Sequence, residues 1–143
     1  MSENAAATTE QMQMPKHGQI CWTEIATKNL EISSNFYRQL FGWNLKRSEA
    51  VGPETEYIEF APEASFPFGG MYQMSEECGN SSSHWMSYVA VDNVDESAEK
   101  VKQLGGDIRV APMDIPNVGR FCVVTDPTGA TFSMITMNPW NQG

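Results

Sequence analysis

A single carboxylate stands in the middle of a run of residues that is otherwise apolar and β-prone. The run reads ICWTEIA, and its fifth residue is Glu24. Burial of a lone charge is costly, so a carboxylate in this place must be exposed, paired or used in chemistry. His84 begins a second β-prone run further along the chain. A carboxylate and an imidazole within hydrogen-bonding distance could transfer protons as a general acid–base pair.

The sequence leaves three interpretations of Glu24 open. Glu24 could accept a hydrogen bond from Tyr88 or from the backbone and so hold two parts of the chain in register. It could act with His84 in proton transfer. It could also form a displaced metal site with His84 and Glu59, because carboxylate and imidazole groups bind divalent metals.

The elements that must position these groups repeat along the chain. Residues 25–42 and 89–106 align without a gap at an offset of 64 residues, and six of the aligned pairs are identical. A unit of this size must bury its apolar face against its copy. The two copies should therefore share one core, and a site between them should be lined by both.

Each copy is predicted to contain a strand, a helix and three further strands. An asparagine begins each helix and glycine ends it, so the helices run from Asn29 to Gly42 and from Asn93 to Gly105 and Gly106. Alternation and turn residues predict strands at 19–27, 45–50, 56–61, 69–74, 84–91, 108–111, 120–125 and 131–137.

This order of elements predicts the fold class. Three consecutive strands without crossover helices exclude a doubly wound parallel sheet. We expect an α+β fold in which two tandem βαβββ modules form a curved, largely antiparallel eight-stranded sheet with a central cleft and helices outside. The expected boundaries are a polar tail at 1–15 and a single domain at 16–140, with module one at 17–78 and module two at 83–138.

Composition narrows the range of partners. The 143 residues carry a net charge of -9 and no cluster of Lys and Arg, so binding to nucleic acid or to a membrane is not expected. The three cysteines are scattered and odd in number, which argues against a disulfide framework or a zinc site. With no recognisable signal peptide or membrane span, a cytoplasmic protein with a neutral or cationic small-molecule partner is expected.

Three motifs and the two βαβββ modules resemble the vicinal oxygen chelate superfamily. The motifs are FYRQLFGW at 36–43, LGG at 104–106 and GRFCVVTDPTGATFSMI at 119–135. This superfamily includes glyoxalase I, extradiol dioxygenases and bleomycin-resistance proteins, and the chain is most similar to a glyoxalase-related branch whose members are often named hydroxylases. The resemblance covers residues 17–138 and implies the fold more strongly than the reaction.

The resemblance also implies a divalent metal, held by His, Gln or Glu from the first and last strand of each module. Carried over to this sequence, the ligand positions fall on Trp22, Met86 and Ser133, with a fourth within Gly69–Met74, where only Gly, Met, Tyr and Gln occur. These side chains do not suit a hard divalent ion. We therefore expect a degenerate metal site and no cofactor, with a metal at Glu24, Glu59 and His84 as the alternative.

Strand alternation predicts which side chains line the cleft. If the two first strands are antiparallel and Trp22 faces Met86, Glu24 should come near His84. Aromatic and apolar walls with few polar groups suit an aromatic or heterocyclic small molecule. The expected ligand-binding residues are Trp22, Met86, Tyr88, Tyr57, Glu59, Ser133 and, at the mouth of the cleft, Arg120.

Three functions from different classes fit these observations. The first is a metal-independent small-molecule-binding protein of the glyoxalase/bleomycin-resistance type, which the resemblance implies to be a homodimer. The second is a lyase, isomerase or oxygenase that acts on a small oxygenated substrate through Glu24, His84 or Glu59. The third is a structural or regulatory module whose cleft is filled by bulky side chains.

Overall fold

Both copies fold into the predicted order of elements, strand, helix and three strands. The computed structural model describes residues 14–48, 56–63, 65–75 and 82–138, so the predicted polar tail at 1–15 lies almost wholly outside the described residues. The first copy supplies β1 (Ile20–Thr27), α2 (Leu30–Phe41), β2 (Asn44–Arg47), β3 (Tyr57–Ala61) and β4 (Gly69–Gln73). The second supplies β5 (His84–Ala90), α3 (Val94–Gln103), β6 (Asp107–Ile115), β7 (Gly119–Thr125) and β8 (Thr131–Met137).

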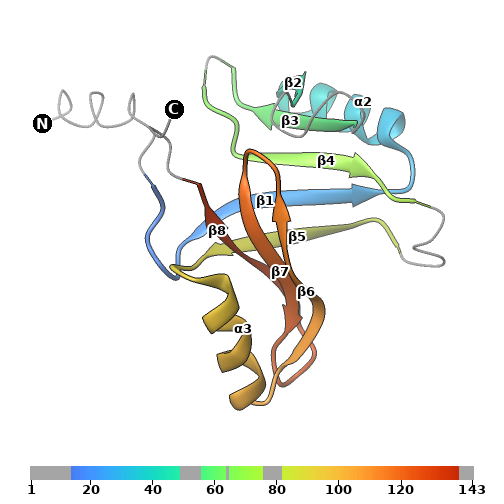
Figure 1. The fold of residues 1–143 in the computed structure, drawn as a ribbon. Helices are drawn as coiled ribbons and strands as arrows, with labels where there is room; N and C mark the ends of the chain where they lie inside the picture. The colour runs from blue at the N-terminus through green and yellow to red at the C-terminus, as the bar shows by residue number, and fades with distance from the viewer. Residues whose placement is uncertain (1–13, 49–55, 64, 76–81, 139–143) are drawn as a thin grey trace, which may run out of the picture.

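The eight strands form one sheet in the order β2-β3-β4-β1-β5-β8-β7-β6. The two first strands, β1 and β5, pair antiparallel at its centre. The last strand of each copy pairs parallel with the first, and the remaining pairs are antiparallel. The sheet is therefore largely antiparallel, and the predicted fold class is confirmed. Figure 1 shows that β6 and β7 run steeply across the direction of β1 and β4, with α2 and α3 far apart.

The helix boundaries follow from the predicted caps. The side chains of Asn29 and Asn93 each accept a hydrogen bond from a backbone N–H three residues later, at 3.0 and 3.1 Å. At the end of α2, Gly42 has a φ of 74°, a left-handed conformation that glycine adopts without steric cost. Gly105 has a φ of 94° just after α3. Both helices therefore begin and end where the sequence predicts, to within about two residues.

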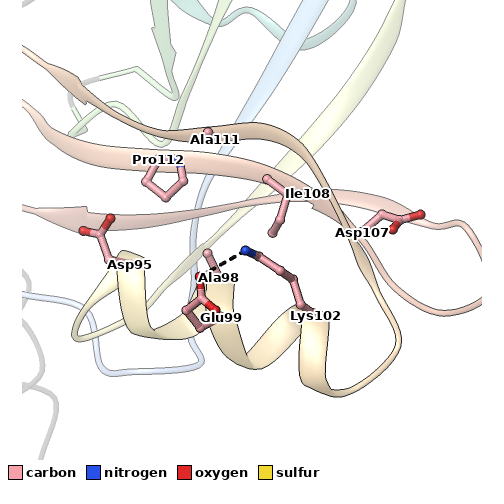
Figure 2. A pocket seen from close by; sticks show the side chains of 8 residues that line it. All are labelled: Asp95, Ala98, Glu99, Lys102, Asp107, Ile108, Ala111 and Pro112. Atoms are coloured by element: carbon pink, nitrogen blue, oxygen red, sulfur yellow. Dashed lines mark hydrogen bonds and ion pairs between the residues drawn. The ribbon is translucent and has the colours of Figure 1, made fainter.

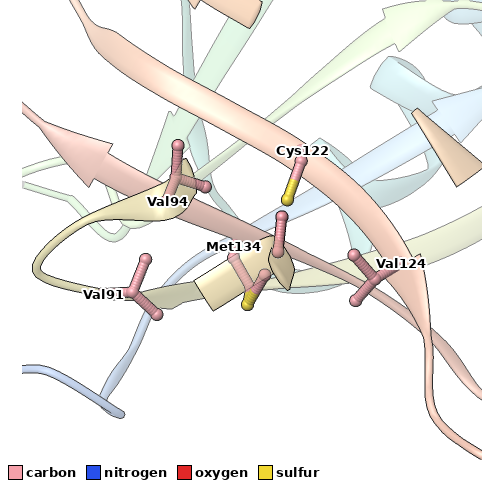
Figure 3. Packing of buried hydrophobic residues seen from close by; sticks show 6 residues of the cluster. Val91, Val94, Cys122, Val124 and Met134 are labelled. Carbon is pink, nitrogen blue, oxygen red and sulfur yellow. The ribbon is translucent and has the colours of Figure 1, made fainter. Parts of the chain in front are cut away.

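Both helices lie on the same side of the sheet, and each covers its own apolar cluster. In Figure 3, Val94 of α3 lies close to Cys122 of β7 and Met134 of β8, in a cluster that also contains Val91, Ala98 and Val124. The cluster of the first copy has three buried members, Ile25, Phe60 and Met71, with partly buried side chains from α2 packed against them. Side chains alternate along a strand, so Glu24 and Tyr88 project from the opposite side, which we call the helix-free face.

One strand is longer than its predicted range. The predicted strand at 108–111 extends to Asp107–Ile115 in the structure, with two irregularities in its pairing with β7. Pro112 lies inside it, and a proline is tolerated there because β6 is an edge strand of the sheet. None of the helices in the described residues is long and apolar enough to span a membrane.

Candidate ligand-binding site

A partly buried carboxylate stands at the centre of the helix-free face. Glu24 Oε2 accepts a hydrogen bond from the Tyr57 hydroxyl at 2.8 Å, and Glu24 Oε1 accepts one from the Tyr88 hydroxyl at 2.9 Å. The Trp22 indole N–H donates to the Tyr57 hydroxyl at 2.9 Å. Each carboxylate oxygen therefore has a phenol partner, and the hydrogen bond to Tyr88 that the sequence offered as a structural role is present.

Two glycines in β4 let aromatic side chains of β3 lie across it. Gly70 pairs with Glu24 of β1, and a Cβ atom at Gly70 would lie 2.1 Å from the ring of Tyr57. A Cβ atom at Gly69 would lie 2.5 Å from the ring of Phe60 on the other face. Tyr57 can reach Glu24 because β4 carries no side chain between them. Sequence reasoning did not assign this role to Gly70, although adjacent glycines inside a predicted strand indicate a close approach.

Burial controls the ionisation of this cluster. It raises the pKa of the Glu24 carboxyl, whereas the hydrogen bonds from Tyr57 and Tyr88, and then the field of His84, lower it. Burial, together with the charge of Glu24, also raises the pKa of both phenols. At neutral pH the phenols therefore keep their protons and donate them in hydrogen bonds to Glu24, which is the hydrogen-bond acceptor of the cluster.

The central hydrogen bond joins equivalent positions of the two copies. Glu24 and Tyr88 are separated by the 64-residue offset of the repeat. Glu24 pairs with Gly70 across β1 and β4, just as Tyr88 pairs with Ser133 across β5 and β8. Gly70 and Ser133 are therefore equivalent too, which identifies Gly70 as the fourth position that the sequence could not locate.

The part of the site that belongs to the second copy is less polar. Ser133 is fully buried, and its hydroxyl donates to Met86 Sδ at 2.8 Å. The ring of Tyr88 lies 6.4 Å from that of Phe121, and on the other side of Glu24 the rings of Tyr57 and Tyr72 stack at 6.4 Å. Glu24 is thus surrounded by aromatic rings from both copies.

Residues 19–134 match the Glyoxalase/Bleomycin resistance protein/Dioxygenase superfamily. The chain belongs to this superfamily. A Mycobacterium bovis protein named Putative glyoxylase CFP32 is 33% identical over 122 residues, which cover 85% of this chain and 45% of that protein. Anthracycline biosynthesis protein DauV of a Streptomyces species is 26% identical over 137 residues, covering 88% of this chain and 48% of that protein. The chain thus spans about half the length of these curated relatives.

Solved structures support the superfamily fold. Methylmalonyl-CoA epimerase from Mycobacterium tuberculosis has a TM-score of 0.57 and 14% identity, covering 90% of this chain and 94% of that chain. A hypothetical protein from Bacillus halodurans has a TM-score of 0.63 and 12% identity, covering 90% of this chain and all of that one, 100%. At such low identity these similarities describe the fold alone.

The metal implied by the superfamily does not fit the residues at its four expected positions. Trp22 presents an N–H donor, Gly70 has no side chain, and the hydroxyl of Ser133 is directed at the thioether of Met86. A hard divalent ion needs carboxylate, carbonyl or imidazole ligands. The alternative set is not assembled either. In the described ranges, no three or more His, Cys, Asp or Glu side chains gather where they could hold a metal ion, so Glu24, Glu59 and His84 do not form such a group.

The predicted register between β1 and β5 was wrong by two residues. Glu24 pairs with Met86, and His84 pairs with Ala26 instead. His84 is exposed, and its Nδ1 lies 2.7 Å from the backbone oxygen of Ser82. The two oxygens of Glu24 accept hydrogen bonds from the Tyr57 and Tyr88 hydroxyls, not from His84. The predicted Glu24–His84 hydrogen bond is therefore absent.

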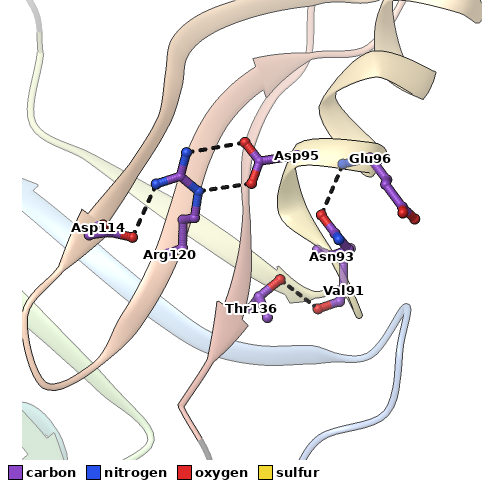
Figure 4. A network of polar contacts seen from close by, with 7 residues as sticks. All are labelled: Val91, Asn93, Asp95, Glu96, Asp114, Arg120 and Thr136. Atoms are coloured by element: carbon purple, nitrogen blue, oxygen red, sulfur yellow. Dashed lines mark hydrogen bonds and ion pairs between the residues drawn. The ribbon is translucent and has the colours of Figure 1, made fainter.

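Arg120 was also misplaced by sequence reasoning. It lies on the helix side of β7, where its guanidinium binds Asp95 of α3 at 2.9 and 3.1 Å and Asp114 of β6 at 3.1 Å (Figure 4). Arg120 has the same strand parity as Cys122, which is buried under α3. Arg120 therefore ties α3 to the sheet and does not line the helix-free face.

A pocket of about 420 Å³ lies on the same side of the sheet, between α3 and β6. In Figure 2, Lys102 extends over its floor and bonds Glu99, while Ile108 and Pro112 form the opposite wall. Of its four ionic side chains, Glu99 and Lys102 pair with each other and Asp95 pairs with Arg120, while Asp107 is the fourth. This pocket shares no residue with the Glu24 cluster.

Proposed function

We propose that the protein is a metal-independent small-molecule-binding protein, and that Glu24 is the anchor for a cationic or hydrogen-bond-donating group of the ligand. The observation that carries the proposal is the carboxylate held by Tyr57 and Tyr88, in the middle of positions that a metal would need. A metal centre attracts anionic oxygens, whereas a carboxylate attracts cations. The guest expected here is therefore opposite in charge to the ligand of a metal site.

The charge balance of the cluster supports this choice. Within the described residues, no Lys or Arg forms an ion pair with Glu24, and only phenol hydrogen bonds and the field of His84 stabilise its charge. A protonated amine would neutralise the carboxylate in a place where water is partly excluded. The rings of Trp22, Tyr57 and Tyr88 would add cation–π attraction.

The comparisons agree with small-molecule binding. One relative is named for anthracycline biosynthesis, and anthracyclines are polycyclic aromatic compounds. We therefore propose an aromatic or heterocyclic amine as the ligand class. Cys21 and Cys122 are free thiols, which agrees with a reducing, cytoplasmic location, and we include that location in the proposal.

A direct test is calorimetric titration of the purified protein with a matched series of aromatic compounds that carry an amine, an alcohol or a carboxylate. We expect the amine to bind and the carboxylate not to bind. Glu24→Gln should weaken amine binding about tenfold or more, equivalent to about 1.4 kcal/mol. Glu96→Gln is the matched control, because Glu96 is exposed on α3, on the other side of the sheet from Glu24.

Two results would overturn this proposal. One is the lack of any saturable ligand in the series, and the other is equal affinity of the amine for wild type and Glu24→Gln. Added Zn²⁺, Ni²⁺ or Mn²⁺ should leave amine affinity unchanged. A metal that raises the affinity would show that a metal participates after all.

A second candidate function is proton abstraction from a small carbonyl compound. It is favoured by the raised pKa of Glu24, because a carboxyl whose pKa is shifted toward neutrality is a better general base. The test is exchange of α-protons for deuterium in D₂O, followed by NMR on small carbonyl compounds. Exchange that disappears in Glu24→Gln would favour this function over simple binding, and its absence in wild type would remove it.

We also propose that the protein is a homodimer, because half-exposed apolar side chains on α2 lack a covering partner in the described structure.

A further inference from the structure

The carboxylate of Glu24 keeps free acceptor capacity on both of its oxygens. An ionised carboxylate can accept about four hydrogen bonds, about two on each oxygen. In the structure, Oε2 accepts one from the Tyr57 hydroxyl and Oε1 accepts one from the Tyr88 hydroxyl. The phenols are divided evenly between the two oxygens. Each oxygen can therefore accept a further hydrogen bond from a ligand.

The two phenols have no proton left for a ligand. A tyrosine hydroxyl carries one proton, and both tyrosines donate it to Glu24. The Tyr57 oxygen in turn accepts a hydrogen bond from the Trp22 indole N–H at 2.9 Å. Tyr88 is also hydrogen-bonded to the Ser133 side chain. The protons of the cluster are thus directed at the carboxylate, so a polar ligand group must approach it as a donor.

The strand order places the two phenols on opposite sides of Glu24. Strands β4 and β5 flank β1, and Tyr88 belongs to β5. Tyr57 belongs to β3 and reaches Glu24 from the other side, across Gly70 of β4. Glu24 itself is partly exposed, and its face is free of helices in the described part of the chain. A ligand that approaches from outside the sheet therefore meets both carboxylate oxygens.

We propose that the ligand binds Glu24 through two parallel N–H donors on one planar edge, as carried by an amidinium, a guanidinium or an amino-substituted heterocycle. This inference rests on the proposed function, because it takes Glu24 as the anchor of the ligand. A planar pair of donors matches the two oxygens of a carboxylate and forms two hydrogen bonds side by side. A primary ammonium is a compact charge whose donors do not form such a pair.

The surroundings of Glu24 also favour a flat ligand group. The ring of Tyr57 lies nearly parallel to that of Tyr72, and the ring of Tyr88 lies beside that of Phe121. Planar, weakly hydrated cations stack on aromatic faces, whereas an ammonium is strongly hydrated. Hydrogen bonds to a partly buried charge are also stronger than the same bonds in water. A ligand that bonds both oxygens is therefore favoured over one that bonds a single oxygen.

The test is calorimetric titration of the wild-type protein with three cations that share a phenyl ring. Benzamidine carries the parallel pair of N–H donors. In N,N-dimethylbenzamidine, methyl groups replace the hydrogens of one nitrogen, and benzylamine carries an ammonium. We expect benzamidine to bind about tenfold or more tightly than either, because each of the others lacks one of the two charged hydrogen bonds. All three are cations at neutral pH, so general attraction to a protein of net charge -9 cannot produce this order.

Two variants locate the preference. Glu24→Gln should abolish the preference for benzamidine over its dimethyl analogue, and Glu96→Gln, at an exposed position of α3, should keep it. Circular dichroism checks that both variants fold, and the comparison of ligands on wild type decides the question even if Glu24→Gln does not.

The outcomes separate this inference from the proposed function. If N,N-dimethylbenzamidine or benzylamine binds wild type as tightly as benzamidine does, the paired contact is wrong, while Glu24 can still anchor a cation. A preference for benzamidine that persists in Glu24→Gln would also overturn the paired contact. If none of the three cations binds, the proposed function itself fails, and this inference fails with it.

Discussion

The two copies share a backbone plan and differ in how they close their cores. In the second copy, α3 buries Val94 and Ala98 against aliphatic side chains. In the first copy, α2 buries none of its residues, and the core beneath it combines Ile25 and Met71 with aromatic rings packed around Phe60. Caps, strand order and pairing have been retained, while the side chains that point outward and into the centre have diverged. The residues that differ between equivalent positions are therefore the ones to examine for function.

The difference between the cores can be measured by cavity formation. Phe60 is fully buried and stacks on Trp43 at 4.4 Å, so Phe60→Ala should lower the free energy of unfolding by about 3–5 kcal/mol. Val124→Ala, in the closed core of the second copy, removes less volume and should cost less. Urea unfolding of both variants measures the two losses. Equal losses would mean that the ring cluster contributes no more than the aliphatic one.

Substituting the two glycines of β4 separates two kinds of steric clash, one with the backbone and one with a side chain. A Cβ atom at Gly69 would lie 2.4 Å from the Thr23 carbonyl oxygen, whereas at Gly70 the three nearest atoms would all belong to the Tyr57 side chain. Gly70→Ala should cost about 1–3 kcal/mol by displacing Tyr57, and Gly69→Ala should cost more. Ser133→Ala, at the position of the second copy equivalent to Gly70, should cost about 1 kcal/mol, because the hydrogen bonds of its hydroxyl to Met86 Sδ and to Tyr88 are lost.

Urea midpoints of these three variants give the order directly. A Gly70→Ala protein as stable as wild type would show that Tyr57 has another place to go. If the Gly70→Ala protein keeps its stability but no longer binds the amine, Gly70 is needed for ligand binding and not for folding.

The smallest expected effect concerns the pH dependence of stability. The folded-state pKa of Glu24 is raised above its ordinary value of 4.5, so the folded protein holds this proton more tightly than the unfolded chain. The stabilisation is complete below pH 4.5 and is lost as the pH rises through the folded-state pKa. The difference in unfolding free energy between wild type and Glu24→Gln should fall over that window by at most about 1.4 kcal/mol per pH unit.

Unfolding titrations between pH 4 and pH 9 measure this difference. Tyr88→Phe removes a hydrogen bond that lowers the pKa of Glu24, so it should move the window to higher pH. A flat difference would contradict a raised pKa, and a window that moves downward in Tyr88→Phe would contradict the role assigned to that phenol.

Most of the fold could be predicted because local signals decide it. The N-cap hydrogen bonds of Asn29 and Asn93 depend only on the next three residues. Gly42 ends α2 by adopting a left-handed conformation, which is also a local property. The register between β1 and β5 could not be predicted. A shift by two residues leaves every side chain on the same face, so the apolar pattern is equally satisfied by either pairing.

The candidate site was predicted in part for the same reason. Trp22, Glu24 and Tyr57 lie on the helix-free face as expected, since face follows from parity. The hydrogen-bond partners of Glu24 depend on the register between β1 and β5 and on a Tyr57 side chain that reaches across β4. Neither can be predicted from the residues next to Glu24 in the sequence. Arg120 is a different case. Its parity with Cys122 was available in the sequence and would have placed it under α3.

The hydrogen bond between Glu24 and Tyr88 can form only because the two copies carry different residues at this position. An ancestor assembled from two identical units would place the same residue at both positions. Two glutamates there would repel each other across the axis, and two tyrosines would offer no anion to bind. The hydrogen bond needs an acceptor from one unit and a donor from the other, which requires two distinct sequences. Fusion in a single chain fixes their ratio at one to one, so every molecule contains one such pair.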